Sequence, residues 1–213
     1  SGQVHVAFPG ETSKTISVYK ELANPQTGII EIGSGTSPSV ELTPDATHFV
    51  TLTADPGNRH SGIAGAAGAH AMIDGNNAGA KQGMLRIGAS YTVIEWLELK
   101  RTCLSCGSTG AIKIDRNSAG AVSNLVFRNL LIHDHRQGIT YGGAADPISL
   151  TLRNSIVYAL SGDSPSAAIE TESSGPTFSG VTVENVTIFG VASANTVAFK
   201  TGISALTIKN TIS

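Results

Sequence analysis

Four segments of the chain repeat one alternation of apolar and polar residues around a central asparagine. Each has apolar residues four and two positions before the asparagine, a charged residue directly before it, and mostly apolar residues after it. A fainter copy carries Trp96 in the asparagine position, so the central positions are 96, 129, 154, 185 and 210, separated by 33, 25, 31 and 25 residues. Such a period is typical of stacked repeats. The four full copies span residues 125–132, 150–157, 181–188 and 206–212.

Each copy reads as two short strands joined at a one-residue corner. Alternation with period two favours strands over helices, and asparagine tolerates the left-handed backbone that such a corner needs. Stacked copies would align the asparagine amides in a ladder with a spacing of about 4.8 Å. Three strands in each repeat predict a solenoid of parallel sheets. The third strands are predicted, after variable loops, at residues 111–115, 138–141, 168–171 and 197–200.

This pattern resembles the pectin-lyase-like superfamily of right-handed parallel β-helices. The resemblance covers nearly the whole chain and includes the asparagine corner and the phrase Ile132-His133-Asp134 that leads into Gly138-Ile139. It implies an all-β fold, a right-handed parallel β-helix (solenoid) that begins with a short amphipathic capping helix. Because the superfamily holds lyases, hydrolases, esterases, phage tailspikes and non-catalytic surface proteins, the resemblance restricts the fold far more than the activity.

The N-terminal segment is expected to form the capping helix. Ser13 is a suitable N-cap, an apolar stripe with helical spacing follows it, and Asn24-Pro25 would end the helix. A helix here would cover the strand edges and apolar side chains of the first coil. The stripe consists of Ile16, Tyr19, Leu22 and Ala23.

The repeats predict a single domain over residues 1–213, with the cap at 1–27 and the coils at 28–213. Ser213 falls inside a predicted strand, where a solenoid would leave a bare edge and an open core. We therefore expect the sequence to be the N-terminal fragment of a longer chain, with further C-terminal coils or another subunit covering this end.

The composition favours an extracellular protein. Charged residues make up 14% of the chain, against about 25% in ordinary domains, and the polar surface is expected to be Ser, Thr, Asn and Gly. A net charge of −2 disfavours a nucleic-acid partner, which usually meets a basic patch. No apolar run reaches the roughly 20 residues of a membrane span. We predict a secreted, extracellular or cell-surface protein.

Cys103 and Cys106 form a lone Cys-x-x-Cys pair. A local disulfide, two free thiols, or a metal or redox site are all compatible with this spacing. A zinc site would need two further ligands, and the chain has no second pair of cysteines.

The outward positions of the third strands form the predicted substrate groove. In polysaccharide lyases of the superfamily, acidic side chains on this strand bind Ca²⁺, and a Lys or Arg removes a proton beside the uronate carboxylate. Hard Ca²⁺ neutralises a carboxylate through oxygen ligands, and the proton must pass to a positioned base. The resemblance therefore implies Ca²⁺ as the cofactor. The candidate Ca²⁺ ligands are Asp115, Glu170 and Glu172, and the candidate bases are Lys113, Lys200 and Arg136.

The same face permits two other interpretations. Glu170 and Glu172 would lie about 7 Å apart on one side of a strand, and paired carboxylates are what a glycoside hydrolase requires. Glu170 would then be catalytic. An ordinary polar solenoid surface is the remaining alternative.

A second outward face is unusually apolar. Its columns are predicted to be Lys100, His133, Tyr158 and Phe189, and Glu98, Leu131, Ile156, Thr187 and Ile212. Three interpretations stay open: a loop of the chain covers this face, a partner subunit does, or Tyr158 and Phe189 stack on sugar rings. His133 and His135 are further candidate substrate contacts, with a metal pair as the alternative for them.

Together these patterns predict an extracellular carbohydrate-active protein, a polysaccharide lyase or glycoside hydrolase acting on an acidic polysaccharide. The alternative is a non-catalytic cell-surface, adhesin or filament-forming protein in which the solenoid serves as a rigid rod.

Overall fold

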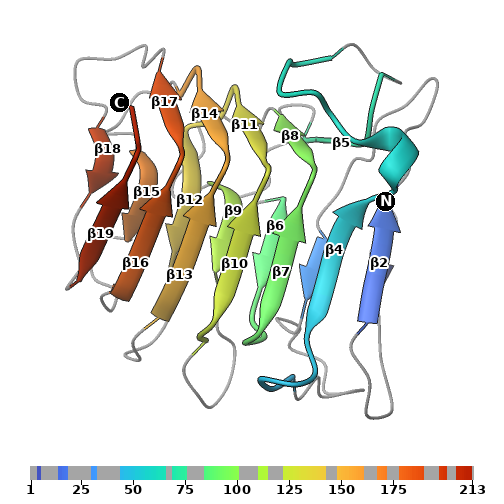
Figure 1. Ribbon diagram of the computed structural model, residues 1–213, viewed down its shortest axis with the longest axis horizontal. Coiled ribbons are helices and arrows are strands. Elements are labelled where there is room, and N and C mark those ends of the chain that lie inside the picture. The colour runs from blue at the N-terminus through green and yellow to red at the C-terminus, as the bar shows by residue number, and fades with distance from the viewer. Residues whose placement is uncertain are drawn as a thin grey trace.

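A computed structural model of the protein shows an almost entirely β structure (Figure 1). Its helical content is one 3₁₀ turn, η1 (Pro56–Asn58), among the residues described. The all-β prediction is confirmed. The structure describes residues 4–5, 14–18, 30–32, 44–65, 69–75, 84–100, 110–114, 122–142, 148–160, 167–171, 178–189, 197–200 and 205–212.

The described strands form three sheets, which we name A, B and C, and their pairings are parallel. Sheet A consists of β1 (Val4–His5), β3 (Ile30–Ile32), β6 (Leu85–Ile87), β9 (Gly110–Ile114), β12 (Gln137–Tyr141), β15 (Ala167–Thr171) and β18 (Val197–Lys200). Sheet B consists of β2 (Lys14–Val18), β4 (Val50–Ala54), β7 (Thr92–Glu95), β10 (Leu125–Arg128), β13 (Ile148–Arg153), β16 (Phe178–Glu184) and β19 (Leu206–Lys209). Sheet C consists of β5 (Met72–Asp74), β8 (Glu98–Lys100), β11 (Leu131–His133), β14 (Ile156–Tyr158) and β17 (Thr187–Phe189).

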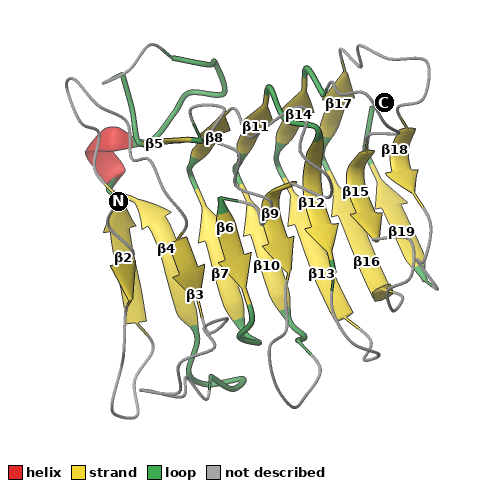
Figure 2. Cartoon of the chain, turned by 180° about the vertical axis from the view of Figure 1, so that it is seen from behind, coloured by secondary structure: helices red, strands yellow, loops and turns green. Residues whose placement is uncertain are grey.

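The chain visits the three sheets in a fixed rotation. From β7 in sheet B it continues to β8 in sheet C and β9 in sheet A, and then returns to sheet B at β10. From β4 to β18, each passage therefore adds one strand to every sheet, beside the strand of the passage before. Figures 1 and 2 show the resulting rows of strands from opposite sides. The third strands predicted from the sequence are β9, β12, β15 and β18.

The core lies between the sheets and follows from the alternation in each strand. In β10, Leu125 and Phe127 are buried, whereas Val126 and Arg128 are half-buried on the outer side. Buried side chains from all three sheets join one apolar cluster. Fully burying a side chain such as Phe127 contributes about 1.5–3 kcal/mol to stability, so the repeated alternation holds the stack together.

The corners between sheets B and C have the backbone predicted for them. Asn129, Asn154, Asn185 and Asn210 all have positive φ, between 48° and 53°. The backbone N–H of each of the first three donates to a carbonyl in the following repeat, at 3.0–3.1 Å. The Nδ2 of Asn185 also donates to the Oδ1 of Asn154 at 3.1 Å. The corners therefore lie in register along the stack, and part of the amide ladder forms.

Replacing Asn185 tests this corner. Asn185→Ala is expected to lower the free energy of unfolding by about 1–2 kcal/mol, because alanine adopts the left-handed backbone poorly. Asn185→Gly keeps that backbone accessible and is expected to lose less, chiefly the amide hydrogen bond. Chemical denaturation of both variants checks this order, and a greater loss for glycine than for alanine would contradict it.

The predicted N-terminal capping helix is wrong where the structure describes that segment. Lys14–Val18 is strand β2, which pairs in parallel with β4 and places Ile16 against the apolar cluster. Thr15, Ile16 and Val18 are β-branched, and such residues favour strands because their side-chain torsions are restricted in a helix. The segment therefore forms a strand that pairs with β4 at the edge of sheet B, although its apolar residues have helical spacing.

Several predicted positions lie outside the described residues. They include the cysteine pair at Cys103 and Cys106, and two of the candidate Ca²⁺ ligands, Asp115 and Glu172.

Candidate functional site

The residues of the predicted substrate groove that the structure describes fall in one register column on sheet A. The register aligns Lys113 with Thr140 and Thr140 with Glu170, and the next strand continues the line at Lys200. On the other side of Lys113 the line continues to Arg86. Neighbouring strands lie about 4.8 Å apart, so the column sets Arg86 and Lys113 side by side and Glu170 two strands further on.

The middle of this column is more enclosed than its ends. Lys113 is half-buried, whereas Thr140 and Glu170 are buried. The Nε2 of Gln137, which is also buried, donates to the Oε2 of Glu170 at 2.5 Å. A Cβ at Gly110 would lie 3.0 Å from the Thr140 side chain, so the glycine makes room for the packing here.

Two buried oxygen atoms beside Glu170 stand out because they lack hydrogen bonds. The Oε1 of Gln137 and the Oγ1 of Thr140 are buried without a partner among the described residues. Leaving a buried polar group unsatisfied costs about 1–3 kcal/mol, and such groups are uncommon in folded proteins. Both atoms lie next to Glu170 in the sheet, which makes this part of sheet A a candidate binding site.

The candidate Ca²⁺ site is incomplete in the part of the chain that the structure describes. Glu170 is the one predicted ligand within it, and its Oε2 already accepts the short hydrogen bond from Gln137. No group of three or more His, Cys, Asp or Glu residues in the described ranges could hold a metal ion. The Ca²⁺ site therefore stays a prediction, because Asp115 and Glu172 lie outside the described residues. Arg136, a candidate base, lies directly before β12 in the sequence.

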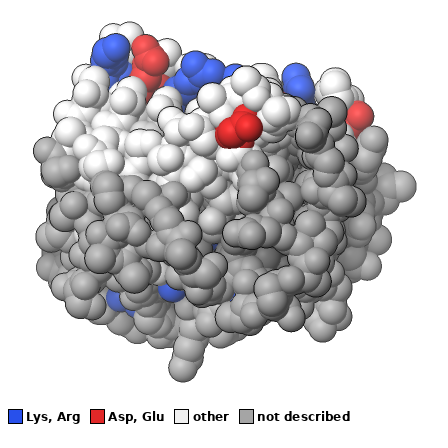
Figure 3. All heavy atoms as spheres, turned by 90° about the horizontal axis from the view of Figure 1, so that it is seen from below, with Lys and Arg blue, Asp and Glu red and all other residues white. Residues whose placement is uncertain are grey.

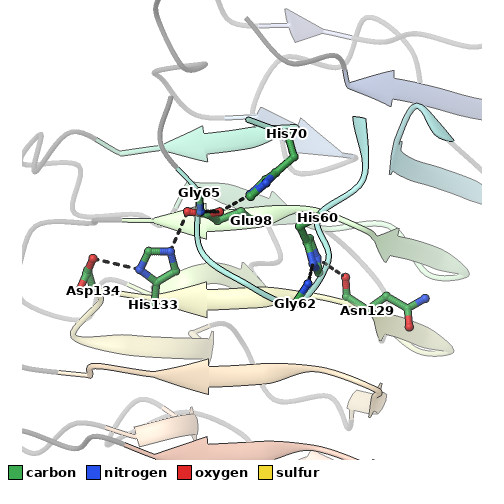
Figure 4. Close-up of polar contacts among 8 residues, drawn as sticks. All are labelled: His60, Gly62, Gly65, His70, Glu98, Asn129, His133 and Asp134. Carbon is green, nitrogen blue, oxygen red and sulfur yellow. Dashed lines mark hydrogen bonds and ion pairs between the residues drawn. The ribbon is translucent and has the colours of Figure 1, made fainter. Parts of the chain in front are cut away.

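The outer face of sheet C is partly covered by the chain itself. Residues 59–65, which we call the strap, cross this face near β8, β11 and β14 (Figure 4). The Nε2 of His60 contacts the backbone carbonyl of Asn129 at 2.8 Å, and a Cβ at Gly62 would lie 3.8 Å from the Ile156 side chain. Leu131, at an outward position, is consequently buried. Of the three interpretations of this face, the covering loop is confirmed for this part.

Beneath the strap, the carboxylate of Glu98 connects β8, which carries it, to the segments that carry Gly65, His70 and His133 (Figure 4). Its carboxylate is fully buried and accepts hydrogen bonds from the Nε2 of His70, from the Nε2 of His133 at 2.9 Å and from the N–H of Gly65 at 3.1 Å. The Nδ1 of His133 in turn faces the Oδ2 of Asp134 at 3.0 Å. Both nitrogens of His133 thus face carboxylate oxygens, and only the imidazolium form can donate from both.

The hydrogen bonds determine the charge of Glu98. Burial alone would raise the pKa of its carboxyl group, but the hydrogen bonds from His133, Gly65 and His70 outweigh burial, so the pKa of Glu98 lies below its ordinary value. Glycine at position 65 is required because a Cβ there would lie 2.5 Å from the Cε1 of His70. The strap is therefore fixed to sheet C through a charged, buried group.

Trp96 provides the second anchor for the strap. It occupies the asparagine position of its repeat and has a φ of 61°, which is rare for a bulky residue. The Cζ of Arg59 lies 4.8 Å from the centre of the Trp96 ring, and the His60 ring lies 6.1 Å from it. Burial lowers the pKa of His60, whose Nδ1 accepts from the N–H of Gly62. The repeat that has Trp96 in place of asparagine is therefore the one against which the strap packs.

The predicted aromatic column of sheet C forms a continuous stack. The rings of His133 and Tyr158 are 4.8 Å apart and tilted by 13°, and those of Tyr158 and Phe189 are 5.0 Å apart and tilted by 5°. Burial raises the pKa of Tyr158, and the negative charges of Glu98 and Asp134 raise it further. His133 is buried at one end of the stack, while Phe189 is exposed at the other.

His135 is fully buried, and its burial predicts that the folded protein loses stability in acid. Its Nε2 donates to the carbonyl of Leu99 at 2.9 Å, and burial lowers its pKa from 6.5 to about 4. The unfolded chain takes up a proton near pH 6.5 while the folded protein does not, so stability is lost as the pH falls from 6.5 towards 4. Glu98 adds a loss in the same direction at lower pH, because its pKa is lowered on folding.

We expect the free energy of unfolding to fall by about 3 kcal/mol between pH 7 and pH 4 on account of His135. Urea denaturation at a series of pH values measures this slope. His135→Gln removes the titrating group and should flatten the slope above pH 4.5. An unchanged slope in this variant would show that His135 does not cause it.

Sheet B carries a column of charges of both signs. The register aligns the residues that directly precede the five corner positions, which are Glu95, Arg128, Arg153, Glu184 and Lys209. The Nε of Arg128 contacts the Oε2 of Glu95 at 2.5 Å. Figure 3 shows, among the described residues, basic and acidic side chains next to one another along one border of the molecule. Mixed charge of this kind gives a solvated face and no continuous basic patch.

Sequence reasoning did not assign a role to Glu98 or His70. One signal was available for Glu98, a carboxylate within an otherwise apolar outward column, whereas no repeat or motif marks the segment that carries His70. No helix in the described ranges is long and apolar enough to cross a membrane. Comparison with protein-family models, with curated proteins and with solved structures finds no match to this chain.

Proposed function

We propose that the chain is a secreted or cell-surface right-handed parallel β-helix of the pectin-lyase-like type. We propose further that it acts on an acidic polysaccharide as a polysaccharide lyase or glycoside hydrolase. The observation that carries this proposal is the register on sheet A, which aligns Arg86, Lys113, Thr140, Glu170 and Lys200 across successive strands.

The charges of this column suit a polymer with regularly spaced carboxylates. Arg86 and Lys113 are adjacent cations on neighbouring strands, and a chain of uronates lying across the strands would meet both. A guanidinium group can hold a carboxylate through two parallel hydrogen bonds, whereas an ammonium group acts as a point charge.

The buried oxygens of Gln137 and Thr140 suit sugar hydroxyl groups. A hydroxyl is both donor and acceptor, so a sugar at this place could donate to the Oε1 of Gln137 and to the Oγ1 of Thr140. These atoms have no hydrogen-bond partner in the described part of the chain. Satisfying them on binding would favour a bound sugar between Lys113 and Glu170.

Two reactions are compatible with this arrangement. In the lyase reaction Lys113, Lys200 or Arg136 takes the proton beside the uronate carboxylate, and the bond to the leaving sugar breaks. In the hydrolase reaction the carboxyl group of Glu170 protonates the leaving oxygen, while a second carboxylate, for which Glu172 is the candidate from the sequence, activates the water that replaces the leaving sugar. His133 and His135 are not included in this site, because both are buried within hydrogen bonds that join strands of sheet C.

The activity test uses the protein and a panel of acidic polysaccharides, with and without added Ca²⁺. Unsaturated products absorb in the ultraviolet and report a lyase, whereas new reducing ends without that absorbance report a hydrolase. Dependence on Ca²⁺ would support the cofactor implied by the resemblance. The absence of both signals with every polyuronate would reject the enzymatic proposal.

Thr140→Val tests the role of the unsatisfied hydroxyl. Removing a buried hydroxyl without a partner should leave stability unchanged or raise it by about 1 kcal/mol. The same change should weaken polysaccharide binding, by roughly 2- to 10-fold for one lost hydrogen bond. Thr151→Val, at an outward position of sheet B, is the matched control and should leave binding unchanged. A destabilised Thr140→Val protein that binds normally would contradict this assignment.

The burial of Thr140 and Glu170 favours a second candidate, a non-catalytic surface protein. In that case the column would stabilise sheet A without reaching a substrate. Glu170→Gln separates a hydrolase from a structural protein, since it should abolish hydrolysis in the former and should change only stability in the latter. For a lyase, the loss of activity in a Lys113→Ala/Lys200→Ala variant makes the same distinction.

A further inference from the structure

The strap over sheet C is held in place with little apolar burial. The side chain of His60 is buried, whereas those of Ser61, Ile63 and Ala64 are exposed, Ile63 by 73%. Apolar burial stabilises a segment in proportion to the area removed from water, so these three side chains contribute little to the closed position. The attachment of the strap therefore depends on polar contacts.

His60 commits both of its ring nitrogens to this attachment (Figure 4). Its Nε2 lies 2.8 Å from the backbone carbonyl oxygen of Asn129, which can only accept, so the Nε2 carries a proton. Its Nδ1 accepts from the backbone N–H of Gly62 at 3.2 Å, so the Nδ1 carries none. The closed strap therefore requires the neutral form of the His60 ring.

A second proton on His60 would disrupt this arrangement. It would turn the Nδ1 into a donor that faces the N–H donor of Gly62, and neither group would then have an acceptor. In the open strap the protonated ring would instead be hydrated. Protonation therefore favours the open strap over the closed one.

The charged and titratable groups around His60 leave its ring neutral in the closed strap. Burial lowers the pKa of His60, and the neighbouring His70 ring, 5.9 Å away, lowers it further. The hydrogen bond to Asn129 and the charge of Glu98 raise it in part. Arg59, directly before His60 in the chain, carries a further positive charge. The pKa of His60 therefore lies below 6.5 while the strap is closed.

We propose that the strap is an acid-sensitive latch, in which protonation of His60 releases residues 60–64 from the corner at Asn129 while the Gly65 end stays bound to Glu98. The pKa of Glu98 lies below its ordinary value, so the Gly65 end keeps its charged acceptor when His60 takes up its proton. The solenoid beneath stays folded. This proposal is independent of the proposed activity.

The latch opens over a defined range of pH. In the open strap His60 takes up its proton near pH 6.5, whereas the closed strap holds the ring neutral to lower pH. The ratio of open to closed strap therefore rises by about 10-fold for each pH unit below 6.5, until the ring of the closed strap is also protonated. Opening uncovers Leu131, which is 1% exposed beneath the closed strap, and so enlarges the apolar area of sheet C in acid.

Trp96 is the single tryptophan of the chain and reports the position of the latch. The His60 ring lies 6.1 Å from the Trp96 ring, so opening should expose the indole to water. The emission maximum should therefore move to longer wavelength as the pH falls from 7 to 5, while circular dichroism stays constant.

Two histidine variants assign this shift. His60→Gln keeps a donor and an acceptor that do not titrate, and its emission maximum should be the same at both pH values. His48→Gln changes a histidine outside the strap, with a side chain that is 39% exposed, and should shift like the unmodified protein. No shift in the unmodified protein, or an equal shift in His60→Gln, would overturn the proposal.

Amide hydrogen exchange locates the opening. Between pH 6 and pH 5 the protection factor of the Gly62 amide should fall by about 10-fold. The protection factors of the Gly65 amide, which is bound to Glu98, and of the Phe127 amide in β10 should stay constant. An equal loss at Gly65 would place the switch at Glu98, and an equal loss at Phe127 would show general unfolding. Either result would overturn the proposal.

Discussion

Replacing Glu98 with alanine is expected to lower the free energy of unfolding by about 3–5 kcal/mol. The carboxylate is fully buried and accepts hydrogen bonds from His70, His133 and Gly65. Its removal leaves two buried histidines and a backbone N–H without their acceptor. Thermal and urea denaturation measure the loss.

Two further variants show whether the loss comes from this network. Glu98→Gln retains one acceptor oxygen without the charge, and its stability should lie between those of the alanine variant and the unmodified protein. Glu184→Ala removes a half-buried carboxylate from sheet B and should change stability by less than about 1 kcal/mol. Equal losses for Glu98→Ala and Glu184→Ala would show that Glu98 does not hold the strap.

On any polyuronate that the protein cleaves as a lyase, Lys113→Ala is expected to reduce kcat by about 10²- to 10⁴-fold, the usual contribution of a general base. Lys113 lies between Arg86 and Thr140 in the column of sheet A, where a uronate bound by Arg86 would present its acidic proton. If Lys200 supplies part of the base function, only the Lys113→Ala/Lys200→Ala double variant will show the full loss.

The matched control is Lys209→Ala, which removes the same charge from an exposed position on sheet B. Its kcat and KM should equal those of the unmodified protein. Full activity in the Lys113→Ala/Lys200→Ala double variant would remove both lysines from the mechanism and leave Arg136 or Glu170 to be tested.

The strands and corners could be predicted from the sequence because they depend on local alternation. Every repeat places apolar residues at the same distances from its asparagine, and the left-handed backbone at Asn129, Asn154, Asn185 and Asn210 follows from one residue type at one position. The outward columns of sheets B and C followed from the same spacing. The line from Lys113 to Glu170 on sheet A follows loops of variable length and was predicted from the alternation within each third strand.

The burial of some of these outward residues by distant parts of the chain could not be predicted from the alternation. The strap reaches Glu98 and Asn129 from 33 and 69 residues away, respectively, and no repeat marks it. Burial of His133, Thr140 and Glu170 likewise depends on distant packing and not on alternation. The helix expected at the N-terminus failed for a related reason, since pairing with β4 decides the structure of Lys14–Val18.

The central functional claim is that an acidic polysaccharide lies along sheet A. The most direct test is an NMR titration of the isotopically labelled protein with a polyuronate, following the backbone amides of all three sheets. We predict that the signals of Lys113, Thr140 and Glu170 shift with a common affinity while those of Val126 and Thr151 on sheet B stay in place. Shifts confined to sheet B or sheet C, or none at any sheet, would contradict it.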